Sequence, residues 1–154
     1  NGEETFGCYV NGELWLFGGV GFYPKLTCFY HQGILYLDAI RERKKINNGN
    51  LYDKSSIGMK LKNPNSHGLE GKYILGDSSS QIWAYFVNIK YPLGDPAFHT
   101  DSNATGVIEI LKHDTVKKIV SGLFEFRAVY LPRNDSIVVN DTFVITDGRF
   151  DVTY

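Results

Sequence analysis

Apolar and polar side chains alternate along most of this sequence, and this period of two residues is the feature that most constrains the fold. In the segment 117–131, the side chains of Phe124, Phe126, Ala128 and Tyr130 point to one side and the charged Glu125 and Arg127 point to the other. Such a period belongs to a β-strand with one buried face, whereas an amphipathic helix repeats about every 3.6 residues. No segment long enough for a stable helix, about 12 residues or more, shows the helical period. The alternation therefore predicts an all-β chain.

Turn residues separate the alternating segments. The pair at 11–12 is Asn-Gly, which accepts the positive φ angles of a type I′ hairpin turn, and it separates 5–10 from 13–17. The Gln-Gly pair at 32–33 predicts a second hairpin in the same way. The polar, Asn- and Gly-rich segment 41–56 predicts a long loop.

The end of the sequence predicts a closing strand. We expect the chain to turn at Asp147-Gly148 and to end in a strand whose Phe150, Val152 and Tyr154 face the core. A terminal strand stays ordered only if it buries one face and pairs its backbone. Its partners must therefore lie earlier in the chain.

A chain of 154 residues fits one ordinary domain, so we expect 1–154 to form a single all-β domain. About ten short antiparallel strands with one apolar face each predict an antiparallel β-sandwich. The alternative is a closed calycin-like β-barrel, and the sequence does not separate the two. A net charge of −1 gives no long-range attraction to nucleic acid, and no stretch approaches the roughly 20 apolar residues of a membrane span.

Aromatic residues make up 14% of the chain, which is more than one face of a small core needs, so some rings are expected to be exposed or to line a cavity. Exposed rings suit the C–H faces of sugars and often mark contact sites. The glycine-rich loop 18–24 presents Phe22 and Tyr23 next to Trp15, and we predict that these three residues bind a ligand. The alternative is that the aromatic side chains simply fill the core.

Polar residues give no recognisable metal or catalytic motif. The densest cluster is Asp95, His99 and Asp101, which could bind a metal or act as acid and base, but Pro92 and Pro96 make this segment equally a rigid surface loop. The histidines stand singly, without the spacing of a preformed zinc site: His31, His67, His99 and His113. We therefore predict no metal site and no cofactor.

Two parts of the sequence resemble a known family. The segments VSGLFEFRAVY (120–130) and VVNDTFVITDGRFDVTY (138–154) resemble a family of small Bacteroidetes lipoproteins that is classed as a domain of unknown function. The opening TFGCYVNGELW (5–15) and the strand GVIEILKHD (106–114) are similar to that family too, whereas 42–80 matches poorly.

The resemblance implies export and a lipid anchor in the outer membrane, facing the periplasm or the outside. Cys8 lies inside a predicted strand and cannot be the lipidated cysteine, so a signal peptide and the lipidated residue are expected before Asn1, or the anchor is lacking. In an exported protein Cys8 and Cys28 could form a disulfide between the first and third strands. The alternative is two buried thiols that act as small hydrophobes.

These features predict a non-enzymatic cell-envelope β-domain that binds a glycan, a peptide or a partner protein. One alternative is a barrel that holds a small apolar ligand among interior aromatic residues. Another is a hydrolase with an unrecognised site around Asp95, His99 and Asp101.

Overall fold

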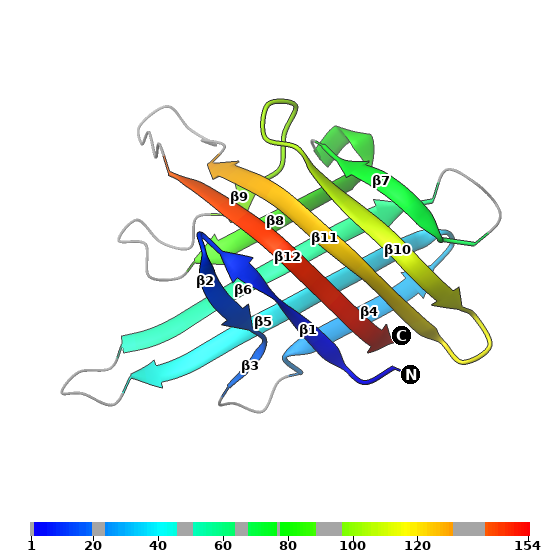
Figure 1. Cartoon of the computed structure of the whole chain (residues 1–154), viewed down its shortest axis with the longest axis horizontal. Helices are drawn as coiled ribbons and strands as arrows, with labels where there is room; N and C mark the ends of the chain where they lie inside the picture. The colour runs from blue at the N-terminus through cyan, green and yellow to red at the C-terminus, as the bar shows by residue number, and fades with distance from the viewer. Residues whose placement is uncertain are drawn as a thin grey trace.

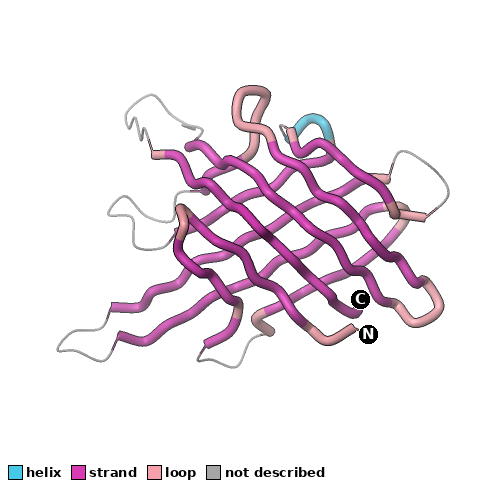
Figure 2. The backbone as a smooth tube through the Cα atoms, viewed as in Figure 1, coloured by secondary structure: helices cyan, strands magenta, loops and turns pink. Residues whose placement is uncertain are grey.

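The computed structural model describes residues 2–19, 24–45, 51–63, 68–76, 78–88, 97–130 and 141–154. These residues form twelve strands and one short 3₁₀ helix. The elements are β1 (Thr5–Val10), β2 (Glu13–Leu16), β3 (Gly18–Gly19), β4 (Leu26–His31), β5 (Ile34–Lys45), β6 (Leu51–Lys62), β7 (Gly71–Leu75), η1 (Ser78–Ser80), β8 (Ile82–Asn88), β9 (Ala97–His99), β10 (Gly106–Asp114), β11 (Ile119–Tyr130) and β12 (Thr142–Thr153). Figure 2 shows how much of the described chain is strand.

Hydrogen bonds join all the strands into one sheet. Its order is β2-β1-β12-β11-β9-β8-β6-β5-β3, with β10 between β11 and β7, and with β4 beside β5. A front layer of β7, β10, β11, β12, β1 and β2 crosses a back layer of β4, β5, β6, β8 and β9 (Figure 1). The long strand β11 joins them, because it pairs with β10 in the front layer and with β9 in the back layer. The prediction of an all-β fold is confirmed. The sheet is nearly closed and barrel-shaped, which fits the predicted alternative of a β-barrel.

The two predicted hairpins are confirmed. Asn11 and Gly12 have φ angles of 50° and 80°, and β1 pairs with β2 across them. Gln32 and Gly33 have φ angles of 50° and 78°, and they connect β4 to β5. Positive φ at both central residues is the geometry of a type I′ turn, whose twist matches that of the flanking strands.

The turn predicted at Asp147-Gly148 is wrong. Strand β12 continues through these residues, and the register with β11 shifts there, since Phe124 faces Gly148 but Phe126 faces Ile145. Two residues of β12 therefore oppose one residue of β11, which is a β-bulge, and Asp147 has the positive φ of 52° that the bulge requires. The extra residue keeps apolar side chains directed inward on both sides of the bulge.

The long loop predicted for 41–56 is also wrong in large part. Strands β5 and β6 pair without a break from Ile34 opposite Lys62 to Lys45 opposite Leu51. This pairing needs only backbone donors and acceptors, so the ladder continues past the apolar part of the two strands. Residues 41–45, four of which are Arg or Lys, consequently lie on a strand rather than in a loop.

The space between the layers is filled by side chains from both. The largest side chains that are almost completely buried are Trp15, Phe98, Leu35, Ile57, Leu61, Leu69, Leu75, Ile108, Ile110, Ile145, Val120 and Val152. Phe150 is only 3% exposed, so the closing strand buries its apolar face as expected. Within the described ranges, no helix is long and apolar enough to cross a membrane.

Candidate binding site

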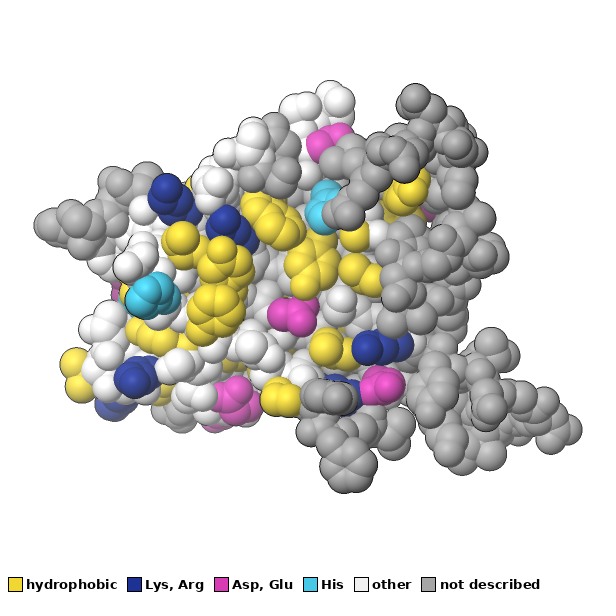
Figure 3. Space-filling model, turned by 180° about the vertical axis from the view of Figure 1, so that it is seen from behind, with side chains coloured by type: hydrophobic (Ala, Val, Ile, Leu, Met, Phe, Trp, Pro, Cys, Tyr) yellow, Lys and Arg dark blue, Asp and Glu magenta, His cyan; other side chains and the backbone are white. Residues whose placement is uncertain are grey.

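A row of side chains crosses the outer face of the back layer. Phe29 of β4 lies opposite Tyr36 of β5. Tyr36 in turn lies opposite Lys60 of β6, and Lys60 opposite Trp83 of β8. Side chains directly opposite one another in antiparallel strands are in contact, so these four form a continuous line across four strands. Figure 3 shows hydrophobic side chains gathered on this rear face, next to lysine and histidine side chains.

The rings of Phe29 and Tyr36 form one wall of the site. Their centroids are 4.6 Å apart and their planes differ by 21°, so the rings stack face to face. Side chains on a strand stand away from the sheet, and rings at this separation can stack only if both stand upright. Phe29 is 49% exposed, although burying an aromatic ring is favourable, so one wall of the site is open to solvent.

A second row forms the floor. Asp38 of β5 lies opposite Gly58 of β6, and Gly58 lies opposite Tyr85 of β8. A Cβ atom at Gly58 would overlap the ring of Tyr85. Because glycine has no side chain, this ring can pack directly on the backbone of β6. The Tyr85 hydroxyl then donates a hydrogen bond to Asp38 Oδ1 over 2.8 Å. The ring of Trp83 lies 5.8 Å from that of Tyr85, with the planes at 36°, and it extends the floor.

Wall and floor enclose a hollow of about 150 Å³. We call it the aromatic hollow, and its main lining residues are Phe29, Tyr36, Asp38, Lys60, Trp83 and Tyr85. Pockets for drug-sized ligands measure about 300–1,000 Å³. The aromatic hollow therefore admits one ring-sized group and leaves the rest of a larger ligand on the surface.

The polar groups of the aromatic hollow are held in place. Burial raises the pKa of Asp38, and the hydrogen bond from Tyr85 and the charge of Lys54 oppose that shift. Burial and the nearby Asp38 charge raise the pKa of Tyr85, so its hydroxyl keeps its proton and remains a donor. The ammonium group of Lys60 lies 5.6 Å from the centre of the Tyr36 ring and donates to Gln81 Oε1 over 2.7 Å. The site thus offers a carboxylate acceptor and an ammonium donor between aromatic rings.

The ligand-binding role predicted for Trp15 is not supported by its position. Trp15 is 0% exposed, because β2 directs this side chain into the core. Its Nε1 donates a hydrogen bond to Ser55 Oγ over 2.9 Å, and its ring packs edge-on against Phe6 at 5.8 Å. A ligand on the surface cannot reach this ring. The other two predicted binding residues, Phe22 and Tyr23, lie outside the described residues.

The structure shows no disulfide between Cys8 and Cys28, both of which are free thiols. Cys8 is buried and Cys28 is half-buried. Burial raises the pKa of each thiol to about 12. These properties match the alternative expectation of small hydrophobic side chains.

In the cluster predicted around His99, the two described residues, His99 and Asp101, have different partners. Asp95 lies outside the described residues. Asp101 accepts hydrogen bonds from the backbone N–H groups of Asn103 and Ala104, over 2.8 and 2.6 Å, and so closes a local turn. His99 lies beside the aromatic hollow instead, 5.8 Å from the ring of Trp83. The described part of the chain contains no group of three or more metal-ligating side chains.

Sequence reasoning missed the wall of the aromatic hollow, although its signal was present. With a two-residue turn at 32–33, counting outward places Phe29 opposite Tyr36. The contribution of Trp83 had no comparable signal. Nothing in the sequence fixes the register between β6 and β8, which are separated by another strand and by η1.

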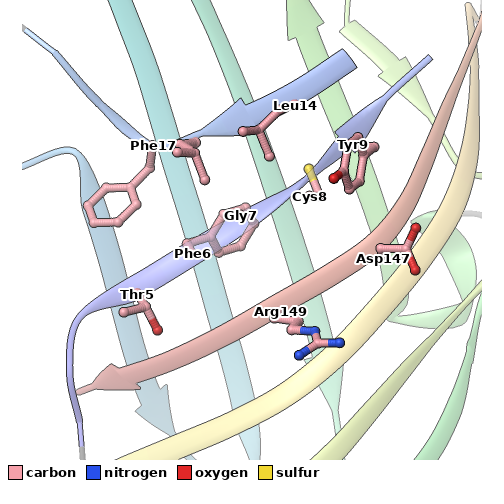
Figure 4. Close-up of a pocket in the computed structure, with 10 residues that line it drawn as sticks. Thr5, Phe6, Gly7, Cys8, Tyr9, Leu14, Phe17, Asp147 and Arg149 are labelled. Carbon is pink, nitrogen blue, oxygen red and sulfur yellow. The ribbon is translucent and has the colours of Figure 1, made fainter. Parts of the chain in front are cut away.

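A second, shallower hollow of about 500 Å³ lies on the front layer (Figure 4). Gly7 of β1 is one of its lining residues, and Leu16 packs over it, since a Cβ atom at Gly7 would lie 2.8 Å from Leu16 Cδ2. Tyr9 and Leu14 contribute apolar surface to it, and Arg149 of the neighbouring strand β12 contributes a charge.

Comparisons with protein-family models, with curated proteins and with solved structures find no match for this chain. Its function is therefore inferred from the geometry of these surfaces. The aromatic hollow combines rings and hydrogen-bonding groups in one place, and it is therefore the candidate binding site.

Proposed function

We propose that this chain is a non-enzymatic β-domain that binds a glycan in the aromatic hollow. One observation carries the proposal. The stacked rings of Phe29 and Tyr36 form the wall of the aromatic hollow, and the rings of Trp83 and Tyr85 form its floor. The hollow measures about 150 Å³, the size of a single ring-shaped group.

The chemistry of the hollow matches that of a sugar residue. A pyranose ring has C–H faces that stack on aromatic rings, and hydroxyl groups around its edge that donate and accept hydrogen bonds. The rings of Trp83 and Tyr85 supply a stacking surface. The carboxylate of Asp38 and the ammonium group of Lys60 line the same hollow and supply an acceptor and a donor. Hydrogen bonds to charged groups are the stronger kind, so these two side chains would fix the orientation of the sugar.

Binding to the surface is favoured over binding inside the barrel, because aromatic side chains occupy the interior. Phe98 is 0% exposed, and its ring lies 4.7 Å from that of Phe143. The ring of Phe86 also packs against that of Phe143, with 4.5 Å between the ring centres. An apolar ligand would have to displace these close contacts, each worth about 0.5–1.5 kcal/mol beyond area burial.

Binding is also favoured over hydrolysis. Glycoside hydrolases generally place two carboxyl groups on either side of the scissile bond, about 5–10 Å apart. Among the described residues that line the hollow, Asp38 is the carboxylate, and it already accepts a hydrogen bond from Tyr85. This arrangement suits a residue that orients a ligand.

A location in the cell envelope is a further part of the proposal, and it rests on the resemblance of 5–15, 106–114, 120–130 and 138–154 to envelope lipoproteins. A surface that binds glycans would meet its ligand there. Fractionation of native cells with an antibody against this chain tests the location, which would be wrong if the chain were found only in the cytosol.

A screen of immobilised glycans, followed by calorimetry with a soluble oligosaccharide, tests the binding function. We expect Trp83→Ala to weaken binding about tenfold or more, which is a loss of at least about 1.4 kcal/mol. Phe29→Ala should also weaken it. Tyr9→Ala is the matched control, because Tyr9 is 41% exposed but belongs to the front layer, and its substitution should leave the affinity unchanged.

The proposal fails if no glycan binds the folded protein. It also fails if a glycan binds but Tyr9→Ala weakens the affinity as much as Trp83→Ala does. Calorimetry with a soluble ligand measures the affinity of each separate site, so association between copies of the chain does not alter this comparison.

A further inference from the structure

The outer face of the front layer exposes an unusual number of apolar side chains. We call the outward side chains of β1, β2, β7, β10, β11 and β12 the front face. Of the nine large apolar side chains that are exposed among the described residues, six lie on this face and line its shallow hollows. They are Tyr9, Leu14, Leu16, Ile74, Leu123 and Val144. Contiguous exposed apolar surface of this kind marks a contact site.

The hollows of the front face adjoin one another. The hollow at Gly7 measures about 500 Å³, and a second hollow of about 370 Å³ shares Asp147 and Arg149 with it. A third, of about 320 Å³, shares Ile74 and Val107 with the second. The apolar surface therefore extends over all six strands instead of forming separate spots.

Charged side chains of both signs stand among the apolar ones. Lys72 forms an exposed ion pair with Glu109, with 3.6 Å between Nζ and Oε2. Along the same row, Glu109 lies opposite Leu123, and Leu123 lies opposite Arg149. The charged residues that line the three hollows are Lys72, Arg127, Arg149, Glu109, Glu125 and Asp147. Three are positive and three are negative, so the charges that line these hollows balance one another.

A balanced face of this kind is complementary to itself. A two-fold axis brings the same patch of two subunits together, and each charge can then meet the opposite sign on the partner. A strongly acidic or basic partner would gain nothing from this pattern. The chain as a whole carries a net charge of only −1, so two copies do not repel one another.

The size of the front face suits a dimer. Six strands about 4.8 Å apart span about 24 Å, and nine residues of strand span about 30 Å, which gives about 700 Å² for each copy. Two copies would bury about 1,400 Å² in total, which falls within the usual range of about 1,200–2,000 Å² for specific interfaces. Sheets commonly pack face to face in this way.

We propose that two copies of this chain associate through their front faces around a two-fold axis. Leu123 is near the centre of the contact, since its row continues through Glu109 on one side and Arg149 on the other. The back layers then face outward on opposite sides of the dimer. This inference rests on the front face alone and is independent of glycan binding.

Sedimentation equilibrium of the purified chain over a hundredfold range of concentration tests the proposal. We expect the wild type to reach twice the chain mass, and Leu123→Lys to remain at the mass of one chain at the same concentrations. The row continues from Arg149 to Gly7 and ends at Leu16, so Leu16→Lys is a second variant with the same expected result. Val116→Lys is the matched control, because Val116 is 91% exposed at the turn between β10 and β11 and should not affect the dimer.

Circular dichroism and thermal melting show whether each variant is folded. All three substituted side chains already point to solvent, so we expect near-native melting. The proposal is overturned if the wild type has the mass of one chain throughout, if both front-face variants still form the dimer, or if Val116→Lys dissociates it equally.

Discussion

The Tyr154 hydroxyl and His113 Nε2 share a hydrogen bond 2.9 Å long, and it fastens the end of β12 to the end of β10. The ring of Tyr30 from β4 lies 4.7 Å from that of His113 and 5.7 Å from that of Tyr154. In the described sheet β4 pairs with β5, and not with β10 or β12. The three rings therefore join the back layer to the front layer where no backbone ladder does.

This cluster makes stability depend on pH. Burial lowers the pKa of His113, while the charges of Glu70 and Asp114 oppose that shift. The folded protein thus binds this proton less readily than the unfolded chain. The contribution of neutral His113 to stability is complete above about pH 6.5 and is lost as the pH falls through the lowered pKa of the folded state.

We expect the melting temperature of the wild type to fall more steeply between about pH 7 and pH 5 than that of His113→Phe. Differential scanning calorimetry in matched buffers measures both. The other histidines are present in both proteins, so the difference between the two curves reports on His113. Backbone N–H groups donate hydrogen bonds to the Glu70 carboxylate and lower its pKa, so Glu70 titrates below this range. Parallel curves for the two proteins would contradict the assignment.

The two cysteines are expected to be unreactive in the folded protein. The thiolate is the reactive form, and burial raises the pKa of Cys8 and Cys28 to about 12. At about pH 8, an alkylating reagent should modify neither residue of the native chain, and both in denaturant. Intact mass spectrometry counts the modified thiols. A chain that remains unmodified in denaturant without reductant, but is modified when reductant is added, would show that a disulfide is present after all.

The fold could be predicted from the sequence wherever a turn or an alternating segment determines the local structure. The candidate site could be predicted only in part. The pairing of Phe29 with Tyr36 follows from the turn at 32–33, because a two-residue loop fixes the register. The hydrogen bond from Tyr85 to Asp38 could not be predicted in this way. These residues are 47 positions apart, and the register that unites them depends on the whole back layer.

Some local sequence patterns are also ambiguous, because the same residues are compatible with two different local structures. Leu14, Trp15 and Leu16 are all apolar, so the alternation does not show which side faces inward. In the structure Trp15 is buried and both leucines are exposed. An Asp-Gly pair suits either a hairpin turn or a bulge. Whether β12 turns or continues at Asp147 is decided by β11 and β1, which pair with it on both sides.

The substitution Trp15→Ala tests whether Trp15 belongs to the hydrophobic core and not to the binding site. Removing a fully buried tryptophan costs about 3–5 kcal/mol of unfolding free energy. The Ser55 hydroxyl, which is 1% exposed, would also lose its partner. Chemical denaturation measures the loss. At a temperature where the variant is still folded, its affinity for a glycan should equal that of the wild type. A loss of affinity in the folded variant would show that Trp15 does contribute to the binding site.

Gly58→Ala tests how the floor of the aromatic hollow is built. The new methyl group would overlap the ring of Tyr85, which must then lift away from β6 and release Asp38. Overpacking of this kind costs about 1–3 kcal/mol. We expect glycan affinity to fall as well, because the floor would be displaced while Phe29 and Tyr36 stay in place.

Tyr85→Phe is the matched control for this substitution. It leaves the ring over Gly58 and removes only the hydroxyl, whose hydrogen bond to the Asp38 carboxylate should be worth about 1.5–3 kcal/mol of stability. Calorimetry should show that Tyr85→Phe retains more affinity than Gly58→Ala, because stacking needs the ring and only the orientation of Asp38 needs the hydroxyl. Equal losses would mean that the hydrogen bond matters more than the shape of the floor. No loss of affinity in Gly58→Ala would place the ligand elsewhere on the molecule.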